Sequence, residues 1–147
     1  MLKDLLLFSC LTTLLLITGC GSKEVCEFTY NEPYSRTMNG HNPYHFKGAT
    51  LSHPKTGARL VFFSTLADWS EIYNNPFFEA AVSQDMEIAD KDENRYHLVL
   101  KQDRNKNLII SHYDDGEVFG YGYTTSAEFL VDNLLNHCND LIDQHVY

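Results

Sequence analysis

Histidine side chains are the first candidates for chemistry in this sequence, because they bind metals and transfer protons near neutral pH. His41 and His45 are four residues apart, but Pro43 between them excludes a regular helix that would present both as ligands. His97 and His112 fall on neighbouring predicted strands, where side-chain parity places them on opposite faces of a sheet. The histidines therefore predict no metal site and favour surface or half-buried roles.

A run of acidic residues, Asp90–Tyr96 ("DKDENRY"), begins like the calcium-binding loop of an EF-hand. The pattern then fails at the two least tolerant positions, with Arg95 in place of glycine and Lys101 in place of the bidentate glutamate. We interpret the run as the tip of a hairpin rather than a calcium site. "DDGE" at Asp114–Glu117 could be a turn or a functional pair of carboxylates, and we prefer the turn.

Catalytic motifs give no further candidates. The sequence has no GxSxG, no HExxH and no glycine-rich loop of the kind that holds phosphates. We therefore expect no enzyme activity, no catalytic residue and no cofactor. Two aromatic stretches, "NPYHF" at 42–46 and "FGYGY" at 119–123, are candidates for a recognition patch, with core packing as the competing explanation.

The first residues resemble a targeting signal rather than a functional site. An apolar run, "LLLFSCLTTLLLI", follows Met1–Asp4 and is too short to cross a bilayer comfortably. It ends in Ile17-Thr18-Gly19-Cys20, which resembles the lipobox that closes the signal peptide of bacterial lipoproteins. Ile17 stands where leucine is commoner, and Asp4 offsets Lys3 in the charged start. The alternative is an uncleaved short anchor with an incidental cysteine.

The resemblance implies a fate for each part of the chain. Residues 1–19 would be removed as the signal peptide, and Cys20 would carry diacylglyceryl and an acyl group such as palmitate on its new amino group. Because Gly21 replaces the aspartate that retains lipoproteins at the inner membrane, the resemblance favours the outer membrane, facing the periplasm. We expect residues 20–42 to form a tether and residues 43–147 a single globular domain.

The cysteines can then be assigned. Cys10 leaves with the signal peptide and Cys20 carries lipid, so Cys26 and Cys138 remain as a pair in an oxidising compartment. We predict a disulfide between them, with two free buried thiols as the alternative. The evidence for a metal site at these cysteines is weaker than for free thiols, because no CxxC or cysteine–histidine spacing accompanies either residue.

Composition predicts a globular acidic domain. Hydrophobic residues make up 44% of the chain and aromatic residues 13%, and the formal net charge is −9. This charge disfavours nucleic acid and anionic headgroups as partners.

Periodicity predicts an α+β fold with a mostly antiparallel sheet of about five strands and a C-terminal amphipathic helix packed on one face. The strands come from a hairpin over 45–64, turning at Pro54 and Gly57, and a meander over 95–124 with a three-residue loop at Arg104–Lys106. Helices are expected at Leu66–Asn74 and 77–82, and residues 83–90 are left open between strand and other structure.

The longest helix is expected to follow the last strand. Thr125 and Glu128 have the spacing of a capping box, and apolar residues then recur through four turns. Gly120 and Gly122 leave one face of the preceding strand bare, where a helix could pack closely.

Three classes of function are compatible with these features. The first is a non-enzymatic binding module held in the envelope by lipid, for example an inhibitor or immunity-type protein. The second is an accessory or structural lipoprotein of an envelope assembly. The third, a hydrolase of cell-wall or lipid substrates, would need a clustered acid–base pair that the sequence does not display.

Overall fold

A computed structural model describes residues 25–39 and 43–147. Cys10, Ile17–Cys20 and His41 lie outside these residues, so the lipobox prediction stays a prediction. The described elements are β1 Thr29–Met38, β2 Tyr44–Ser52, β3 Arg59–Asp68, the 3-10 turn η2 Trp69–Glu71, α2 Pro76–Val82, β4 Met86–Asp92, β5 Arg95–Leu100, β6 Lys106–His112, β7 Glu117–Thr124, the 3-10 helix η3 Thr125–Leu130, α3 Val131–His137 and α4 Asn139–His145.

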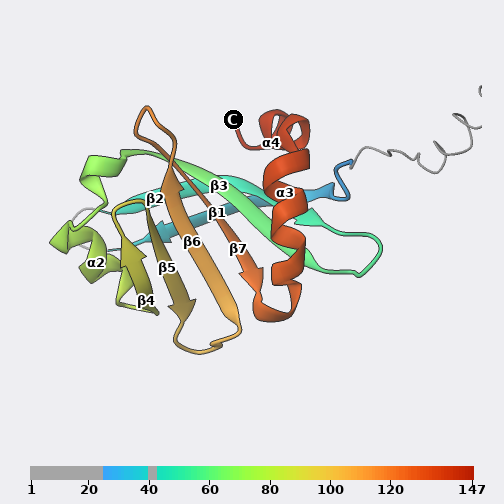
Figure 1. Ribbon diagram of the computed structural model, residues 1–147. Coiled ribbons are helices and arrows are strands. Elements are labelled where there is room, and N and C mark those ends of the chain that lie inside the picture. The colour runs from blue at the N-terminus through green and yellow to red at the C-terminus, as the bar shows by residue number, and fades with distance from the viewer. Residues whose placement is uncertain (1–24, 40–42) are drawn as a thin grey trace, which may run out of the picture.

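The strands form one sheet of seven in the order β1-β2-β3-β7-β6-β5-β4, and every neighbouring pair is antiparallel. The predicted α+β class is confirmed, but the predicted number of about five strands is wrong. The two additional strands are β1 and β4, which form the two edges of the sheet. Two meanders, β1–β3 and β4–β7, therefore meet where β3 pairs with β7 (Figure 1).

The first edge strand corrects the expected tether over 20–42. Residues 29–38 pair with β2 along their whole length, apart from one register shift between Tyr30 and Glu32. The sequence "TYNEPYSRTM" does not predict this strand. Most of its side chains are exposed, so it has no alternating apolar pattern, and Pro33 lowers its propensity for a β-strand. Proline is tolerated there because an edge strand leaves alternate N–H groups unpaired.

The segment 66–74 is not the predicted helix. β3 continues to Asp68, and only a 3-10 turn follows, closed by a capping box in which Asp68 and Glu71 each bond the other's backbone. Asn74 then adopts a φ of 54°, which ends any helical path. Asn75 caps α2, where Pro76 occupies the first turn, so the predicted helix at 77–82 is present and the undecided segment after it becomes β4.

The hairpin agrees with its prediction, and the meander agrees in its side-chain parity. The loop predicted at Arg104–Lys106 is misplaced, because residues 101–105 connect β5 to β6 and Lys106 already belongs to β6. Gly57 has a φ of 77° in the β2–β3 turn. Leu98 pairs with Leu108 and Tyr96 with Ile110, which is the side-chain parity expected from a three-residue loop.

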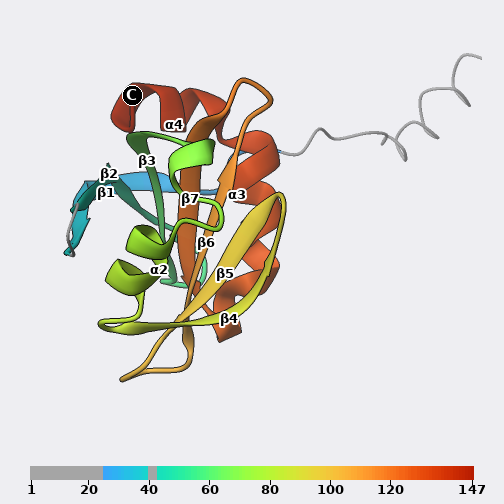
Figure 2. The ribbon, with the colours of Figure 1, turned by 90° about the vertical axis from the view of Figure 1, so that its left-hand side faces the viewer.

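The sheet lies between α2 on one side and α3 and α4 on the other (Figure 2), and each of its faces carries a buried cluster. On one face α2 and η2 pack against alternate strand residues, with Phe46, Phe63, Tyr96 and Ile110 among the most buried. The other face carries Leu51, Leu60 and Phe62 together with apolar residues of the C-terminal helical segment.

The glycines of β7 lie on the face opposite the C-terminal segment. A Cβ atom at Gly120 would lie 2.4 Å from the Phe63 ring, and one at Gly122 would lie 2.8 Å from Val61. They therefore make room for side chains of β3. The expected close packing of a helix on these glycines is wrong. Phe119, Tyr121 and Tyr123, on the other face of β7, pack against the cluster that contains the C-terminal helices.

The C-terminal segment is broken rather than one continuous helix. It begins as 3-10 helix η3, becomes α3, and turns at Cys138, whose φ and ψ are −112° and 24°, before α4. The predicted capping box is not formed, because the N-cap is Thr124 and its side chain makes no cap hydrogen bond. The predicted apolar stripe is buried nonetheless, with Leu134 and Cys138 at 0% and 1% exposure.

Candidate binding surface

An open groove of about 1040 Å³ is lined by the start of β2, the end of β3 and the C-terminus. We call it the C-terminal groove, because the last two residues form one of its walls. Its lining includes Pro43, His45, Lys47, Leu66, Glu71 and Tyr147.

Strand register explains how residues from distant parts of the chain meet in this groove. Lys47 of β2 pairs with Ser64 of β3, and both lie on the face that carries the C-terminal helices. The register of β3 shifts after Thr65, and Leu66 in this irregular stretch is completely exposed, at 106% of its reference area. Since strand side chains alternate between faces, this irregularity re-aims a large apolar side chain into solvent.

Tyrosine side chains fix two walls of the groove. The Tyr44 ring packs edge-on against Phe78, with centroids 5.2 Å apart, and its hydroxyl donates to the Glu71 carbonyl oxygen at 3.4 Å. Burial raises the pKa of Tyr44, so it stays a neutral donor. The hydroxyls of Tyr147 and Tyr113 are 3.1 Å apart, which links the C-terminus to the β6–β7 turn. The walls are therefore held by the core and by this contact.

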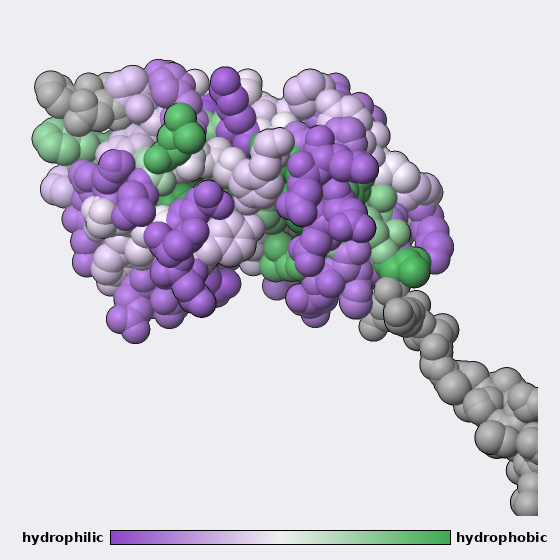
Figure 3. Space-filling model, turned by 90° about the horizontal axis from the view of Figure 1, so that it is seen from above, coloured by the Kyte–Doolittle hydropathy of each residue, from purple (hydrophilic) through white to green (hydrophobic). Residues whose placement is uncertain are grey.

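The groove offers a mixed surface rather than a reaction centre. Its lining includes the apolar Leu66 and Ala67 as well as the charged Lys47 and Glu71. His45 also lines it, with Nδ1 3.1 Å from the Thr37 hydroxyl. Seen from above, the molecule shows small hydrophobic patches within a largely hydrophilic surface (Figure 3). Such an arrangement suits contact with another macromolecule, in which an apolar centre is surrounded by polar groups.

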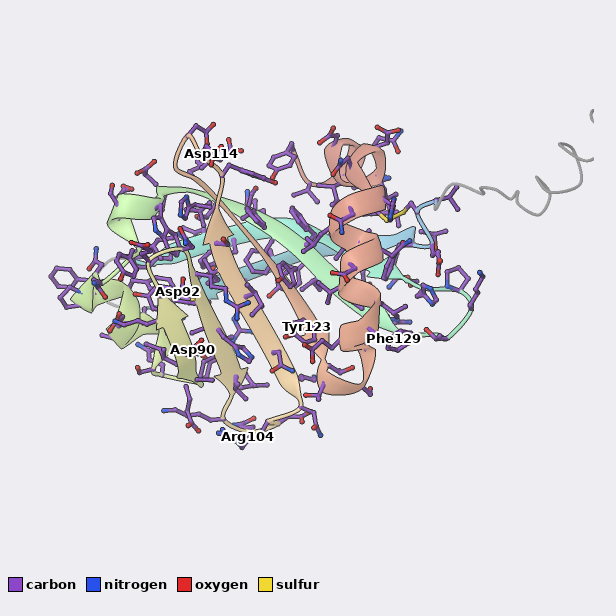
Figure 4. The ribbon with its side chains drawn as sticks, viewed as in Figure 1. Asp90, Asp92, Arg104, Asp114, Tyr123 and Phe129 are labelled. Carbon is purple, nitrogen blue, oxygen red and sulfur yellow. A yellow bond between two sulfur atoms is a disulfide. The ribbon has the colours of Figure 1, made fainter. Side chains whose placement is uncertain are left out.

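The two predicted recognition stretches have different outcomes. Of "NPYHF", Pro43, Tyr44 and His45 line the C-terminal groove, while Phe46 is a core residue at 1% exposure. Of "FGYGY", Phe119 stacks on Phe62 and Tyr113, and Tyr121 stacks on Tyr123. These rings are half-buried beside the C-terminal helices, as Figure 4 shows for Tyr123, so packing accounts for them.

The predicted cysteine pair is brought together. The sulfur atoms of Cys26 and Cys138 are 2.10 Å apart, and the Cα atoms 4.8 Å. Asn133 of α3 adds a second connection beside it, because its amide oxygen accepts from Glu27 N and its Nδ2 donates to Val25 O, both at 2.8 Å. The start of the described chain is thus fastened to the C-terminal helices (Figure 4).

A buried histidine fastens the same segment to the β2–β3 turn. His53 is 2% exposed, with Nε2 2.8 Å from Glu27 Oε1 and Nδ1 2.9 Å from the Thr56 hydroxyl. The hydrogen bond from His53 is the main cause of a lowered pKa for the Glu27 carboxyl. No sequence signal predicts this pair, because Glu27 falls within the expected tether over 20–42.

His97, His112 and the acidic turn motifs lie where the sequence places them. His97 bonds Asn107, while His112 stacks on Trp69 on the opposite face of the sheet. Asp92 accepts from the backbone N–H groups of Asn94 and Arg95 and so shapes the β4–β5 turn.

Asp115 shapes the β6–β7 turn in the same manner, by accepting from Glu117 N at 2.9 Å. Figure 4 shows Asp90 and Asp92 along β4 and Asp114 at this other turn. Within residues 25–39 and 43–147, no group of three histidine, cysteine or acidic side chains has the arrangement of metal ligands.

None of the helices in the described ranges combines the length and apolar character of a membrane-spanning segment. Comparisons of the chain with protein-family models, curated proteins and solved structures give no match.

Sequence reasoning missed most of the groove. Leu66 was assigned to a helical stripe, and Val146 and Tyr147 carried no signal at all. Only the short polar-aromatic stretch before β2 drew attention to this end of the molecule.

Proposed function

We propose that the protein is a lipid-anchored bacterial envelope lipoprotein whose folded domain is a non-enzymatic protein-binding module, for example an inhibitor or immunity-type protein. The lipobox-like Ile17–Cys20 supports an anchor on Cys20, and Gly21 supports the outer membrane. The exposed Leu66 in the C-terminal groove supports protein binding.

The arrangement of the domain suits this proposal. β1 begins on the side where the described chain enters the domain and runs to the opposite side (Figure 1), where β2 begins at Tyr44 directly after Pro43. Ten residues of strand span roughly 33 Å at 3.3 Å per residue. An anchor on Cys20 would hold the entry side near the bilayer and leave the Pro43 side of the groove directed away from it.

The single observation that carries protein binding is the complete exposure of Leu66 inside a hollow surface. A lone exposed leucine is ordinary, but one within a groove of mixed polarity gives a partner side chain an apolar contact at the centre of an interface. The acidic net charge of the domain favours a cationic partner surface around that contact.

A photoreactive phenylalanine analogue in place of Leu66, expressed in cells with the lipidated chain, tests the proposal. We expect it to crosslink one defined envelope protein. The matched control carries the analogue at Phe129, which is also exposed, at 70%. Figure 4 shows Phe129 at the far end of the C-terminal segment from the turn carrying Asp114.

Binding by the purified partner should then weaken in Leu66→Asp and not in Phe129→Asp. Equal crosslinking at both positions, or equal loss of binding in both variants, would contradict a site in the groove. The identity of the partner separates the two binding roles: a secreted toxin or wall-degrading enzyme supports inhibition, and a secretion or transport component supports the accessory role.

The anchor has an independent test. Cys20→Ser should accumulate as an unprocessed precursor that incorporates no labelled palmitate. Normal processing of this variant would indicate an ordinary secretory signal and would leave the groove proposal unaffected.

A further inference from the structure

A second groove lies on the other side of the sheet, on the face that carries α2. Its volume is about 390 Å³, and its lining comes from β1, β3, β4, β5, β6 and β7. We call it the basic groove, because its rim carries Arg36, Arg59 and Lys106. No aspartate or glutamate is among the described residues that line it, although the whole chain has 20 acidic and 11 basic residues.

Two of the three cations have no ion-pair partner within the described ranges. Arg36 is paired with Asp85 and is half-buried. Arg59 and Lys106 are exposed, and no carboxylate of the described residues forms a salt bridge with either. Elsewhere on the domain Lys91 and Arg104 do have such partners. The groove therefore brings three cationic side chains together, and two of them form no ion pair with a described residue.

Strand register places the two unpaired cations on either side of β7. Lys106 of β6 pairs with Thr124 of β7. Val61 of β3 pairs with Gly122, and continuing this register by two residues sets Arg59 beside Thr124 on the other side. Arg59 and Lys106 are therefore two strands apart on the same face, with Cα atoms roughly 10 Å apart at the usual strand spacing. Their long side chains can converge on one anionic group above Thr124.

The floor of the groove is apolar. Tyr34, Val61 and Leu100 are partly buried at its surface and pack on the core cluster of this face, and Leu108 and Met86 lie among them. Gly122 contributes no side chain, and the side chains of Val61 and Leu108 close over it, so they make an apolar surface across β7. Burial raises the pKa of Tyr34, whose phenol is therefore neutral beside Arg36. An apolar floor with a few convergent polar groups is typical of small-ligand sites.

We propose that the basic groove binds a single-chain amphiphile with an anionic head: a carboxylate or phosphate held by Arg59 and Lys106, with an aliphatic chain lying over Val61, Leu100 and Leu108. The guanidinium of Arg59 provides two parallel donors for either head, and Lys106 adds a point charge. A cationic head would be repelled by the rim, and a head without charge would gain nothing from it.

Decanoate and decyl phosphate, used below their micellar concentrations, are the probes. Decyltrimethylammonium and decyl maltoside have the same chain with a cationic or neutral head, and inorganic phosphate has the head without a chain. Calorimetric titration of the disulfide-bonded domain should show binding of the two anionic probes and weaker binding of the other three. The relative affinity of decanoate and decyl phosphate identifies the preferred head.

Charge-removing variants locate the head group. Arg59→Gln and Lys106→Gln should each weaken decanoate binding about tenfold, because each removes a charge-assisted contact. Lys55→Gln is the matched control: it removes the same charge from an exposed position in the β2–β3 turn, outside the groove, and should leave the affinity within twofold. Amide chemical shifts in the unmodified domain should change on β3, β6 and β7 around the groove.

Three results would overturn the proposal. The first is equal affinity for decanoate and decyl maltoside, and the second is an equal loss of affinity in Lys55→Gln and Arg59→Gln. The third is a set of chemical-shift changes confined to the C-terminal groove. The shift experiment needs no variant, so it decides the question even where a substitution impairs folding.

Discussion

Tyr96→Phe should destabilise the domain, because one buried hydroxyl joins three elements. The Tyr96 ring is completely buried, and its hydroxyl donates to Glu79 Oε2 of α2 at 2.6 Å and accepts from Asn74 N at 2.9 Å. Lys91 of β4 donates to the same carboxylate oxygen at 2.7 Å. The hydroxyl therefore connects β5 to α2 and to the turn before it.

The size of the effect follows from what is left unpaired. Removing the hydroxyl keeps the ring but leaves the Asn74 N–H without a hydrogen-bond acceptor, which costs about 1–3 kcal/mol. Glu79 also loses a hydrogen bond, although Lys91 remains. We expect a loss of about 2 kcal/mol in the free energy of unfolding, which lowers the urea midpoint by roughly 1 M at a typical denaturant slope.

Urea unfolding followed by circular dichroism measures this change. Tyr73→Phe is the matched control, since its ring stacks on Trp69 and its hydroxyl makes no hydrogen bond to a described residue. The control should change stability by less than about 0.5 kcal/mol. Equal stability of Tyr96→Phe and the unmodified protein, or an equal loss in both variants, would refute this account of the hydroxyl.

Acid should reduce the difference between Tyr96→Phe and the unmodified protein. Burial opposes ionisation of Glu79, but the hydrogen bonds from Lys91 and Tyr96 outweigh it and lower the pKa of the carboxyl below 4.5. A lowered folded-state pKa adds stability above the unfolded-state value, and this stability is lost as pH falls through the folded-state value. A difference that stays constant from pH 7 to pH 3 would show that Glu79 takes no part.

Three other perturbations address the remaining connections. Replacing Cys26 and Cys138 together by serine should lower the free energy of unfolding by about 4–5 kcal/mol on the chain-entropy model, since the closed loop spans 112 positions, and a loss below 1 kcal/mol in urea would contradict this. Glu27→Gln should lower the urea midpoint at pH 7, because the hydrogen bond from His53 lowers the pKa of Glu27 in the folded state. This difference should begin to shrink as the pH falls below 4.5 and disappear once the pH is below the lowered folded-state pKa; a pH-independent difference would argue against the pair. Gly120→Ala should lose about 1–3 kcal/mol because the new Cβ meets Phe63 and the Ile109 carbonyl oxygen, and a melting temperature equal to that of the unmodified protein would contradict this contact.

Local signals predicted the elements whose own residues determine them. Gly57, with its positive φ, marked the β2–β3 turn, and the alternation of Tyr96, Leu98 and Leu100 set the register of the meander. The apolar stripe around Leu134 marked the C-terminal segment, although its breaks did not show in the periodicity. In each case the local pattern and the tertiary environment agree.

The errors arise where tertiary contacts decide. β1 is an edge strand with mostly exposed side chains, so its stability comes from pairing with β2 and not from its own pattern. The spacing of Leu66, Trp69, Ile72 and Tyr73 suits a helix, but Leu66 points to solvent while Trp69 and Ile72 join the core after the chain turns at Asp68. Both grooves are lined by residues from strands that are distant in sequence, so no single stretch of the sequence predicts either groove.

The strand order has a consequence for the sequence of events in folding. A chain that emerges N-terminus first can form β1–β3 early. The partner of β3 in the middle of the sheet is β7, which is synthesised later, and Cys26 cannot form its disulfide before Cys138 is available. Both meanders are built from neighbouring strands that can form locally, whereas joining them requires closing long loops and is expected to be slow. Until β7 and the C-terminal helices are available, the inner edge of β3 lacks its partner and Phe62 lacks the cover of those helices. The growing chain therefore has no complete core to trap it in a folded state, and folding is completed only by its final segment.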